Sequence, residues 1–216
     1  MRILLLLISM FTSTAFAAEE FVDLSWNCKV RVVSETPTNQ EIKADVLFLI
    51  GFSDRADNHS PLFSELTNAG FRVISFDYPS HGETDCWNLD LHNFTSLSNI
   101  AEAVLKTPKF SSDKPLYLTG WSTGGLLAYR LMQRGYFSDR AVAGLVLLAP
   151  GFSVYKIPGE FGMVTIDSLL SNPNPPHKGE IKPASPLLYL GFSSSLLTNS
   201  ILAQHQPVPD VPILMI

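Results

Sequence analysis

The residues most suited to chemistry lie in the run G-W-S-T-G-G at 120–125, which has the spacing G-x-S-x-G. A serine hydroxyl is presented to a carbonyl carbon when it projects from a sharp turn between a strand and a helix, and flanking glycines leave room for the chains that meet there. The helix after the turn directs its first N–H groups and its positive dipole end toward the oxyanion that forms. The pattern therefore predicts Ser122 as the nucleophile of an acyl transfer, with Gly120 and Gly124 as the glycines of the turn. A plain helix-capping serine is the alternative, which the strand and helix around the motif disfavour.

Segments with the character of strands and helices alternate around this motif. Short apolar runs typical of buried parallel strands lie at 44–50, 72–76, 116–120 and 143–149. Apolar residues recur at helical spacing in the segments between and after them, at 61–69, 94–105 and 125–134. This alternation predicts an α/β fold, with a mostly parallel sheet, helices on both faces, and a site at the carboxyl ends of the strands. An earlier segment, 21–33, has alternating β character.

The first 18 residues have the features of a secretory signal peptide. Arg2 precedes an aliphatic run from Ile3 to Ile8, and small residues lead to A-F-A-A at 15–18. Cleavage there would start the mature chain near Glu19, so we expect an exported protein, periplasmic or secreted. An uncleaved membrane anchor or a buried strand is the alternative, although the apolar run is short for a bilayer span.

The cysteines, Cys28 and Cys86, take their meaning from this expected export. In an oxidising compartment they are candidates for a disulfide, and two buried thiols are the alternative. Their separation does not fit the ligand spacing of a zinc site, and the sequence implies no metal and no other cofactor. The formal net charge is −5 and no long basic run exists, which argues against nucleic-acid binding.

The segment 44–151 resembles the α/β-hydrolase fold and, within it, the branch of monoacylglycerol lipases, lysophospholipases and serine aminopeptidases. The resemblance rests on V-L-F-L-I-G-F (46–52), F-S-E-L-T-N-A-G-F-R-V-I-S-F-D (63–77), Y-P-S-H-G-E-T (78–84), the serine motif and G-L-V-L-L-A-P (144–150). It implies an oxyanion hole formed by the backbone N–H groups of Phe52 and Thr123. It also implies that His81, in the sequence P-S-H-G, is structural and not catalytic. Many relatives have His-Gly in the first loop, where this chain has Ile50-Gly51.

The regular alternation ends at Gly151, and a stretch rich in Pro, Ser and Asn follows, which divides the chain into a core and a cap. Residues 19–150 correspond to the N-terminal part of the core, 151–209 to an inserted cap or lid, and 210–216 to the start of the next core strand. In the family the acid follows this strand and the histidine comes later, so we expect both to be absent from this chain. We therefore expect a C-terminally truncated hydrolase that lacks the last strand and helix and is inactive as this fragment. His177 and His205 in the cap are less favoured as bases, and Asp167 and Asp210 precede the usual position of the acid.

The implied reaction is a two-step acyl transfer on a small-molecule or lipid ester, with a lipid mono- or lysoester as the expected substrate. Apolar cap residues would line an acyl-chain tunnel or contact a membrane surface, or would form the cap's own small core. They are Phe152, Tyr155, Phe161, Leu169, Leu170, Leu187, Leu188, Tyr189 and Phe192. A serine aminopeptidase of the same fold is one alternative function. A non-catalytic hydrolase-fold protein, or a degraded gene product, is the other.

Overall fold

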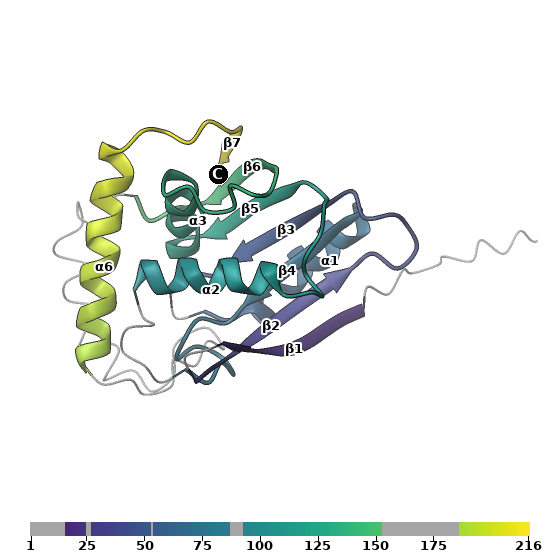
Figure 1. Ribbon diagram of the computed structural model, residues 1–216, viewed down its shortest axis with the longest axis horizontal. Helices are drawn as coiled ribbons and strands as arrows, with labels where there is room; N and C mark the ends of the chain where they lie inside the picture. Colours follow the sequence, from purple (N-terminus) through teal and green to yellow (C-terminus); the bar gives the residue numbers. More distant parts are fainter. Residues whose placement is uncertain (1–15, 25–26, 53, 87–92, 153–185) are drawn as a thin grey trace, which may run out of the picture.

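The computed structural model describes residues 16–24, 27–52, 54–86, 93–152 and 186–216. One seven-stranded sheet runs through them in the order β1-β2-β4-β3-β5-β6-β7 (Figure 1). The strands are β1 (Phe16–Leu24), β2 (Cys28–Thr36), β3 (Ala44–Leu49), β4 (Phe71–Phe76), β5 (Leu116–Trp121), β6 (Val142–Leu148) and β7 (Ile213–Met215). Neighbouring strands from β4 to β7 in this order pair in parallel. Strand β2 pairs antiparallel with both β1 and β4. The predicted α/β fold with a mostly parallel sheet is thus confirmed.

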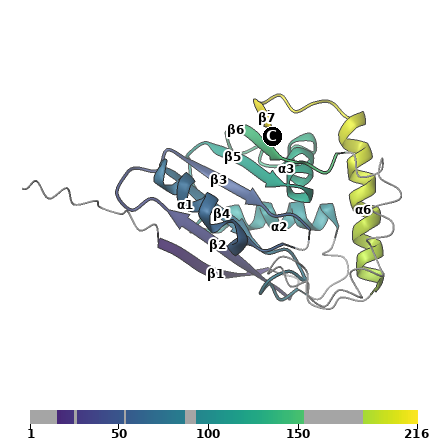
Figure 2. The same ribbon diagram turned by 180° about the vertical axis from the view of Figure 1, so that it is seen from behind.

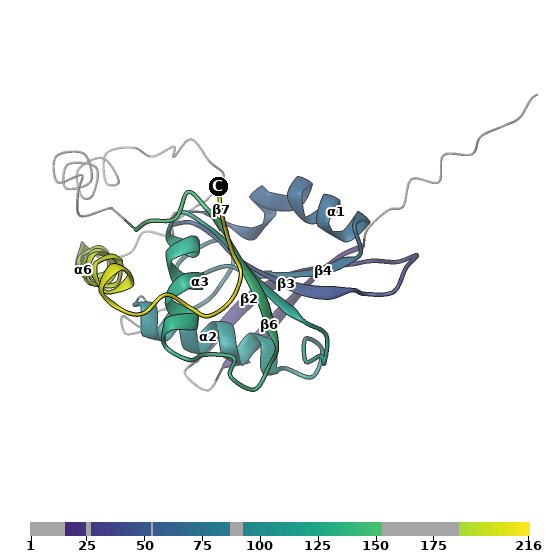
Figure 3. The same ribbon diagram turned by 90° about the horizontal axis from the view of Figure 1, so that it is seen from above.

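Helices cover both faces of this sheet. The helical elements are the 3-10 turn η1 (Ala56–His59), α1 (Ser60–Asn68), α2 (Phe94–Lys106), α3 (Thr123–Gln133) and α6 (Pro186–His205). Helix α1 lies on one face, and α2 and α3 lie on the other (Figures 2 and 3). None of the described helices is long and apolar enough to cross a membrane.

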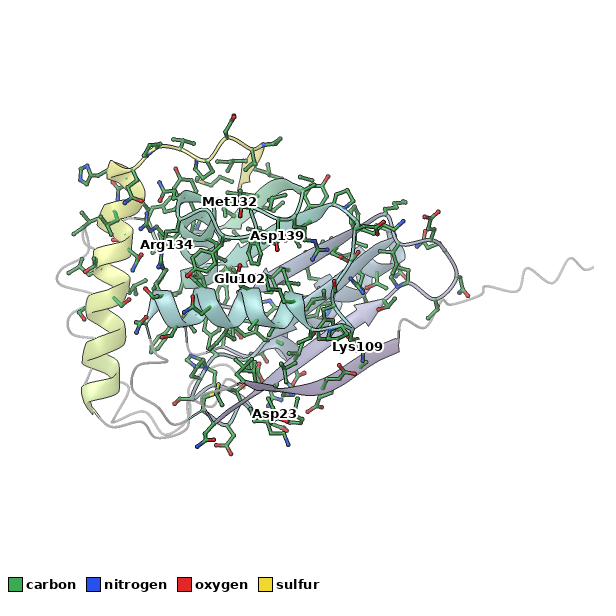
Figure 4. The ribbon with its side chains drawn as sticks, viewed as in Figure 1. Asp23, Glu102, Lys109, Met132, Arg134 and Asp139 are labelled. Atoms are coloured by element: carbon green, nitrogen blue, oxygen red, sulfur yellow. A yellow bond between two sulfur atoms is a disulfide. The ribbon has the colours of Figure 1, made fainter. Side chains whose placement is uncertain are left out.

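Helix α2 shows why the sequence folds in this way. Its buried apolar residues recur at helical spacing, and the Asn93 side chain caps its start by accepting a hydrogen bond from Ser96 N. The charged residues near its end lie outside the core: Glu102 pairs with Lys106 at 2.9 Å, and Lys109 pairs with Glu20 of β1 (Figure 4). Exposed pairs of this kind contribute little to stability, so the buried face holds α2 on the sheet.

The central strands are buried because helices cover them on both sides. All residues of β3 are buried, which fits its nearly continuous apolar run. Its one charged residue, Asp45, pairs with Arg72 and Arg140. The ring of Phe48 packs against the rings of Phe63 from α1 and of His59, with centroids 5.2 and 4.5 Å apart. This packing fixes the position of the chain that leaves β3 at Leu49. The first loop, which contains the predicted oxyanion donor Phe52, begins there.

The early β-rich segment differs from its expected form, because it is a hairpin of two strands. β1 pairs antiparallel with β2 from Phe16↔Thr36 to Leu24↔Cys28. Asn27, with φ 53°, has the left-handed backbone that asparagine tolerates in tight turns. The strand begins inside the predicted signal peptide, and cleavage after Ala18 would remove its first three residues and leave the pairs from Glu19↔Val33 onward.

A disulfide joins Cys28, the first residue of β2, to Cys86 in the loop after β4. The neighbouring residues reinforce the link, because Lys29 and Asp85 exchange two backbone hydrogen bonds of 2.9 Å. The loop that contains His81 is therefore tied to the sheet at its far end.

Removal of this disulfide is expected to destabilise the fold. The double variant Cys28→Ser/Cys86→Ser should lose about 3 kcal/mol of unfolding free energy in urea denaturation, because its unfolded chain is no longer closed into a loop. Reductant should destabilise the wild type by a similar amount and leave the double variant unchanged. Equal stability of the oxidised wild type and the double variant would contradict this role.

Helix α6 belongs to the segment that the sequence assigned to a cap with no regular pattern. It lies beyond the carboxyl ends of the parallel strands (Figure 1). Hydrogen bonds join it to the core. Arg130 Nε of α3 donates to Asn199 Oδ1 at 3.1 Å, and Phe94 N of α2 donates to Ser195 Oγ at 3.1 Å. Four of the nine cap residues predicted to line a tunnel, Tyr155, Phe161, Leu169 and Leu170, lie at 153–185, outside the described residues.

The segment predicted as a strand at 210–216 is shorter in the structure. Only Ile213–Met215 form β7, which pairs in parallel with β6 through Leu145↔Ile213 and its neighbours. Pro212 lacks the N–H that a strand needs, although its carbonyl accepts from Leu145 N at 2.9 Å.

Candidate active site

Ser122 occupies a strained turn between β5 and α3. Its φ of 54° and ψ of −116° lie in a region that residues with a side chain rarely adopt. Three backbone hydrogen bonds hold it there: Ser122 N donates to Leu148 O at 2.8 Å, and Ser122 O accepts from Leu126 N at 3.2 Å and Gly151 N at 3.0 Å. The side chain is not buried. The turn thus has the form that the sequence predicted for a nucleophile.

The glycines of the motif are required by the close approach of backbone atoms. A Cβ atom on Gly120 would lie 2.4 Å from the carbonyl group of Gly124, and one on Gly124 would lie 2.0 Å from Leu49 O. Real Cβ atoms do not come this close, so both positions admit only hydrogen. The contact of Gly124 with Leu49 brings the end of β3 against the start of α3.

The first loop lies directly beside the serine turn. A Cβ atom on Gly51 would lie 3.0 Å from Trp121 Cε3 and 3.6 Å from Ser122 Cβ. Phe52 follows Gly51, and Thr123 is the first residue of α3, where helix N–H groups lack intrahelical partners. The structure therefore brings the loop with Phe52 beside Ser122 and Thr123, which lie far from it in the sequence.

His81 is buried and contacts this loop through its ring. Its Nδ1 is 2.9 Å from Pro79 O, and its ring lies edge-on to the rings of Phe52 and Tyr78, with centroids 5.6 and 5.7 Å apart. These contacts are those of a packing residue.

Tyr78 fixes the carbonyl at the start of the first loop. Its hydroxyl donates to Ile50 O at 2.8 Å, and both residues are fully buried. Burial, and then the charge of Asp54, raises the pKa of Tyr78 well above its ordinary value, so the hydroxyl remains protonated. Tyr78 was not among the residues predicted for the site, because a tyrosine after a strand has no distinctive motif.

A second pair that the sequence did not reveal is Asp54 with His59. Asp54 Oδ2 lies 2.6 Å from His59 Nε2, and Oδ1 accepts from Asn58 Nδ2 and from Arg55 N. Burial alone would raise the pKa of Asp54, but the hydrogen bonds from His59 and Asn58, the charge of His59 and the Arg55 amide together lower it. The centroid of the His59 ring lies 5.9 Å from that of Trp121, so the Asp54–His59 pair links the first loop to the residue before Ser122.

Arg31 of β2 is buried and pairs with three carboxylates, of which Asp77 is buried and Asp57 and Glu19 are partly exposed. It donates to Asp77 at 3.0 Å, to Asp57 at 2.8 Å and to Glu19 at 2.9 Å. Burial alone would lower the pKa of Arg31, but the hydrogen bonds to the three carboxylates raise it. Asp77 also accepts from Ala56 N at 2.8 Å, so these ion pairs join the ends of β4 and of the first loop.

No side chain in the described ranges forms a hydrogen bond with the hydroxyl of Ser122. His59 bonds to Asp54, His81 lies against Pro79, and His205 is exposed on α6. Within the same ranges, no group of three or more His, Cys, Asp or Glu residues is arranged to hold a metal ion. His177 and Asp167 lie outside the described residues, and Asp210 is exposed in the turn before β7.

Solved structures similar to this chain include a soluble variant of a monoglyceride lipase from Saccharomyces cerevisiae and a mutant epoxide hydrolase from Solanum tuberosum. The lipase matches with a TM-score of 0.64 and 16% identity, over 94% of this chain and 77% of that one. The epoxide hydrolase matches with a TM-score of 0.61 and 16% identity, over 93% of this chain and 81% of that one. At this identity the likeness establishes the fold, which is that of the α/β-hydrolases.

Two comparisons concern the sequence itself. An acyl transferase from Photobacterium leiognathi is 35% identical over 72 residues, which are 32% of this chain and 24% of that protein. The sequence model of the family described as serine aminopeptidase, S33, matches residues 40–183, which is more than half of the chain and includes the serine turn and the first loop. The chain therefore belongs to the serine aminopeptidase S33 family of α/β-hydrolases.

Proposed function

We propose that this protein is a serine hydrolase of carboxylic esters, with Ser122 as its nucleophile and an acyl-enzyme as its intermediate. The observation that supports this most strongly is the backbone of Ser122, with φ of 54° at the point where β5 turns into α3. A strained, non-buried serine at the positive end of a helix is suited to attack on a carbonyl carbon. A capping serine would need no such backbone.

In the proposed first step, Ser122 Oγ attacks the ester carbonyl carbon as its proton passes to a general base, and the carbonyl π electrons move to the oxygen. We propose that the N–H groups of Phe52 and Thr123 hold this oxyanion, which favours the transition state over the bound ester. The tetrahedral species then expels the alcohol, which takes up a proton, and leaves the acyl group on Ser122. Water releases the acid by the same steps and restores the hydroxyl.

The reaction also needs a general base and a group that orients it. The histidines in the described part of the chain are engaged elsewhere or exposed, as described above. We propose that the base and its acid come from outside the described residues, in agreement with the order of catalytic residues expected from the family resemblance.

The preferred substrate class is a carboxylic ester with a lipid chain, of the mono- or lysoester kind. The monoglyceride lipase has a similar fold, and the acyl transferase is similar in sequence over 72 residues. A lipase and an acyl transferase can both act by passing an acyl group through a serine ester. The family description favours a second candidate, an aminopeptidase that cleaves an amide. Export of the protein is part of the proposal, and the disulfide between Cys28 and Cys86 supports it.

Ester and amide cleavage distinguish the two candidates. Short- and long-chain p-nitrophenyl esters and proline p-nitroanilide should be compared with protein expressed from its complete reading frame. Each kcat/KM is divided by the uncatalysed rate of the same compound, because activated esters react faster without an enzyme. We expect the larger ratio for the esters, rising with chain length. A larger ratio for the prolyl amide would replace the esterase with the aminopeptidase.

A further inference from the structure

The loop that follows β3 is held by a side chain from the next loop of the sheet. The hydroxyl of Tyr78 donates to Ile50 O at 2.8 Å. Ile50 begins the described stretch 50–52, which ends at Phe52, the proposed donor of one oxyanion N–H group. The position of that N–H group depends on the orientation of the peptide groups that precede it.

We propose that Tyr78 is a positioning residue, which orients residues 50–52 after β3 so that the Phe52 N–H group faces the oxyanion formed at Ser122. This inference rests on the proposed function, and it adds a residue outside the serine motif to the machinery of the site.

The Ile50 carbonyl is confined from two directions. Tyr78 donates a hydrogen bond to its oxygen, and the same oxygen lies 2.5 Å from the place that a Cβ atom of Gly124 would occupy. The next residue, Gly51, lies against Trp121 and Ser122. A rotation of the peptide group between Ile50 and Gly51 would therefore lose the hydrogen bond and disturb the contact with the serine turn.

Because both groups are buried, the Tyr78 hydroxyl takes the place of water as the donor to this carbonyl. Ile50 is 0% exposed and Tyr78 is 1% exposed, so solvent does not compete for either group. The rings of Phe76 and His81 lie 5.6 and 5.7 Å from the ring of Tyr78, which limits its movement. The His81 ring also contacts Phe52, so Tyr78 is linked to the loop through its hydroxyl and through its ring.

The far end of the loop is also held by side-chain contacts. Asp54 accepts hydrogen bonds from Asn58 and from the backbone of Arg55, and its other oxygen contacts His59. With the end at Asp54 fixed in this way, the hydroxyl of Tyr78 sets the orientation at the start. Its removal should loosen the loop without unfolding the sheet.

The test compares Tyr78→Phe with Tyr136→Phe, a matched control that also loses one tyrosine hydroxyl. Tyr136 donates to Asn99 Oδ1 at 2.7 Å, and it lies after α3, away from the serine turn. Both variants, expressed from the complete reading frame, are treated with a fluorophosphonate at several concentrations. We expect Tyr78→Phe to lower the limiting rate of phosphonylation about tenfold, with the half-saturating concentration unchanged, and Tyr136→Phe to change neither.

Hydrogen–deuterium exchange supplies a readout that does not depend on turnover. We expect faster exchange in the segment 51–55 of Tyr78→Phe and unchanged exchange in β5, which reports whether the fold is intact. As a second measurement, phosphonylation of the wild type should slow exchange in 51–55, because the phosphonyl oxygen accepts from Phe52 N–H. That result does not depend on how the variant folds.

The outcomes separate the two proposals. A wild type that is labelled, with equal rates and equal exchange in Tyr78→Phe and Tyr136→Phe, overturns the role of Tyr78 alone. Unchanged exchange in 51–55 after phosphonylation of the wild type overturns the placement of the Phe52 N–H group. A wild type that is not labelled overturns the proposed function, and the role of Tyr78 with it.

Discussion

Replacement of Ser122 by alanine is expected to abolish labelling by a fluorophosphonate and to lower ester hydrolysis at least about a thousandfold. The hydroxyl of Ser122 is the group that forms the covalent bond in both reactions. The remaining activity would come from the oxyanion donors and from substrate binding alone. Because alanine keeps the Cβ atom, the strained backbone at φ 54° is not relieved and the turn keeps its shape.

The control for this prediction is Ser111→Ala, which removes the hydroxyl of an exposed serine in the loop after α2. Labelling and turnover of this control should equal those of the wild type. The labelled peptide, identified by mass spectrometry, should contain Ser122. A Ser122→Ala protein that is still labelled at a serine and still hydrolyses esters would exclude Ser122 as the nucleophile.

Replacement of Gly124 by alanine is expected to destabilise the protein by about 3 kcal/mol or more. The added Cβ atom would lie 2.0 Å from Leu49 O and 2.5 Å from Ile50 O, so the start of α3 and the end of β3 must separate. Helix propensity alone predicts the opposite sign, because alanine in a helix is about 1 kcal/mol more favourable than glycine. The sign of the measured change therefore distinguishes the close contact from propensity.

Chemical denaturation of Gly124→Ala should be compared with that of Gly135→Ala. Gly135 has a positive φ of 73° and no heavy atom within 4 Å of its added Cβ, so only the backbone conformation opposes alanine there. We expect a loss of about 1 kcal/mol for Gly135→Ala. A Gly124→Ala protein as stable as the wild type would show that β3 and α3 separate easily, and that the serine turn does not require glycine at this position.

The sequence alone predicted the elements that repeat along the chain. The apolar runs at β3, β4, β5 and β6, and the helical spacing of α1 and α2, reflect local physical requirements. Strands covered on both faces are mostly apolar, and a surface helix presents one apolar side. The serine motif between a strand and a helix is local in the same sense, because the turn is built from adjacent residues. These features identified the fold without any knowledge of which segments touch.

The hairpin at the start of the chain and helix α6 were not predicted. In the hairpin, one stretch of β character contains two strands and a turn at Asn27, and only their pairing separates them. In α6, which has no strong apolar side, contacts such as Arg130 with Asn199 hold the helix to the core. Since both arise from partners far along the chain, a local pattern does not contain them.

The tertiary structure alone decided which groups surround the serine turn. Sequence by itself determined that a serine would stand at a glycine-lined turn after a buried strand, because that turn is built from adjacent residues. Only the tertiary structure showed that Leu49 O is what excludes a side chain at Gly124. The contact of Gly51 with Ser122, the hydrogen bond of Tyr78 with Ile50 and the pair of Asp54 with His59 all join segments that meet only when β3, β4 and β5 lie side by side. Hydrogen bonds and close contacts act over a few ångströms, so their partners are set by strand order in the sheet and not by distance along the chain.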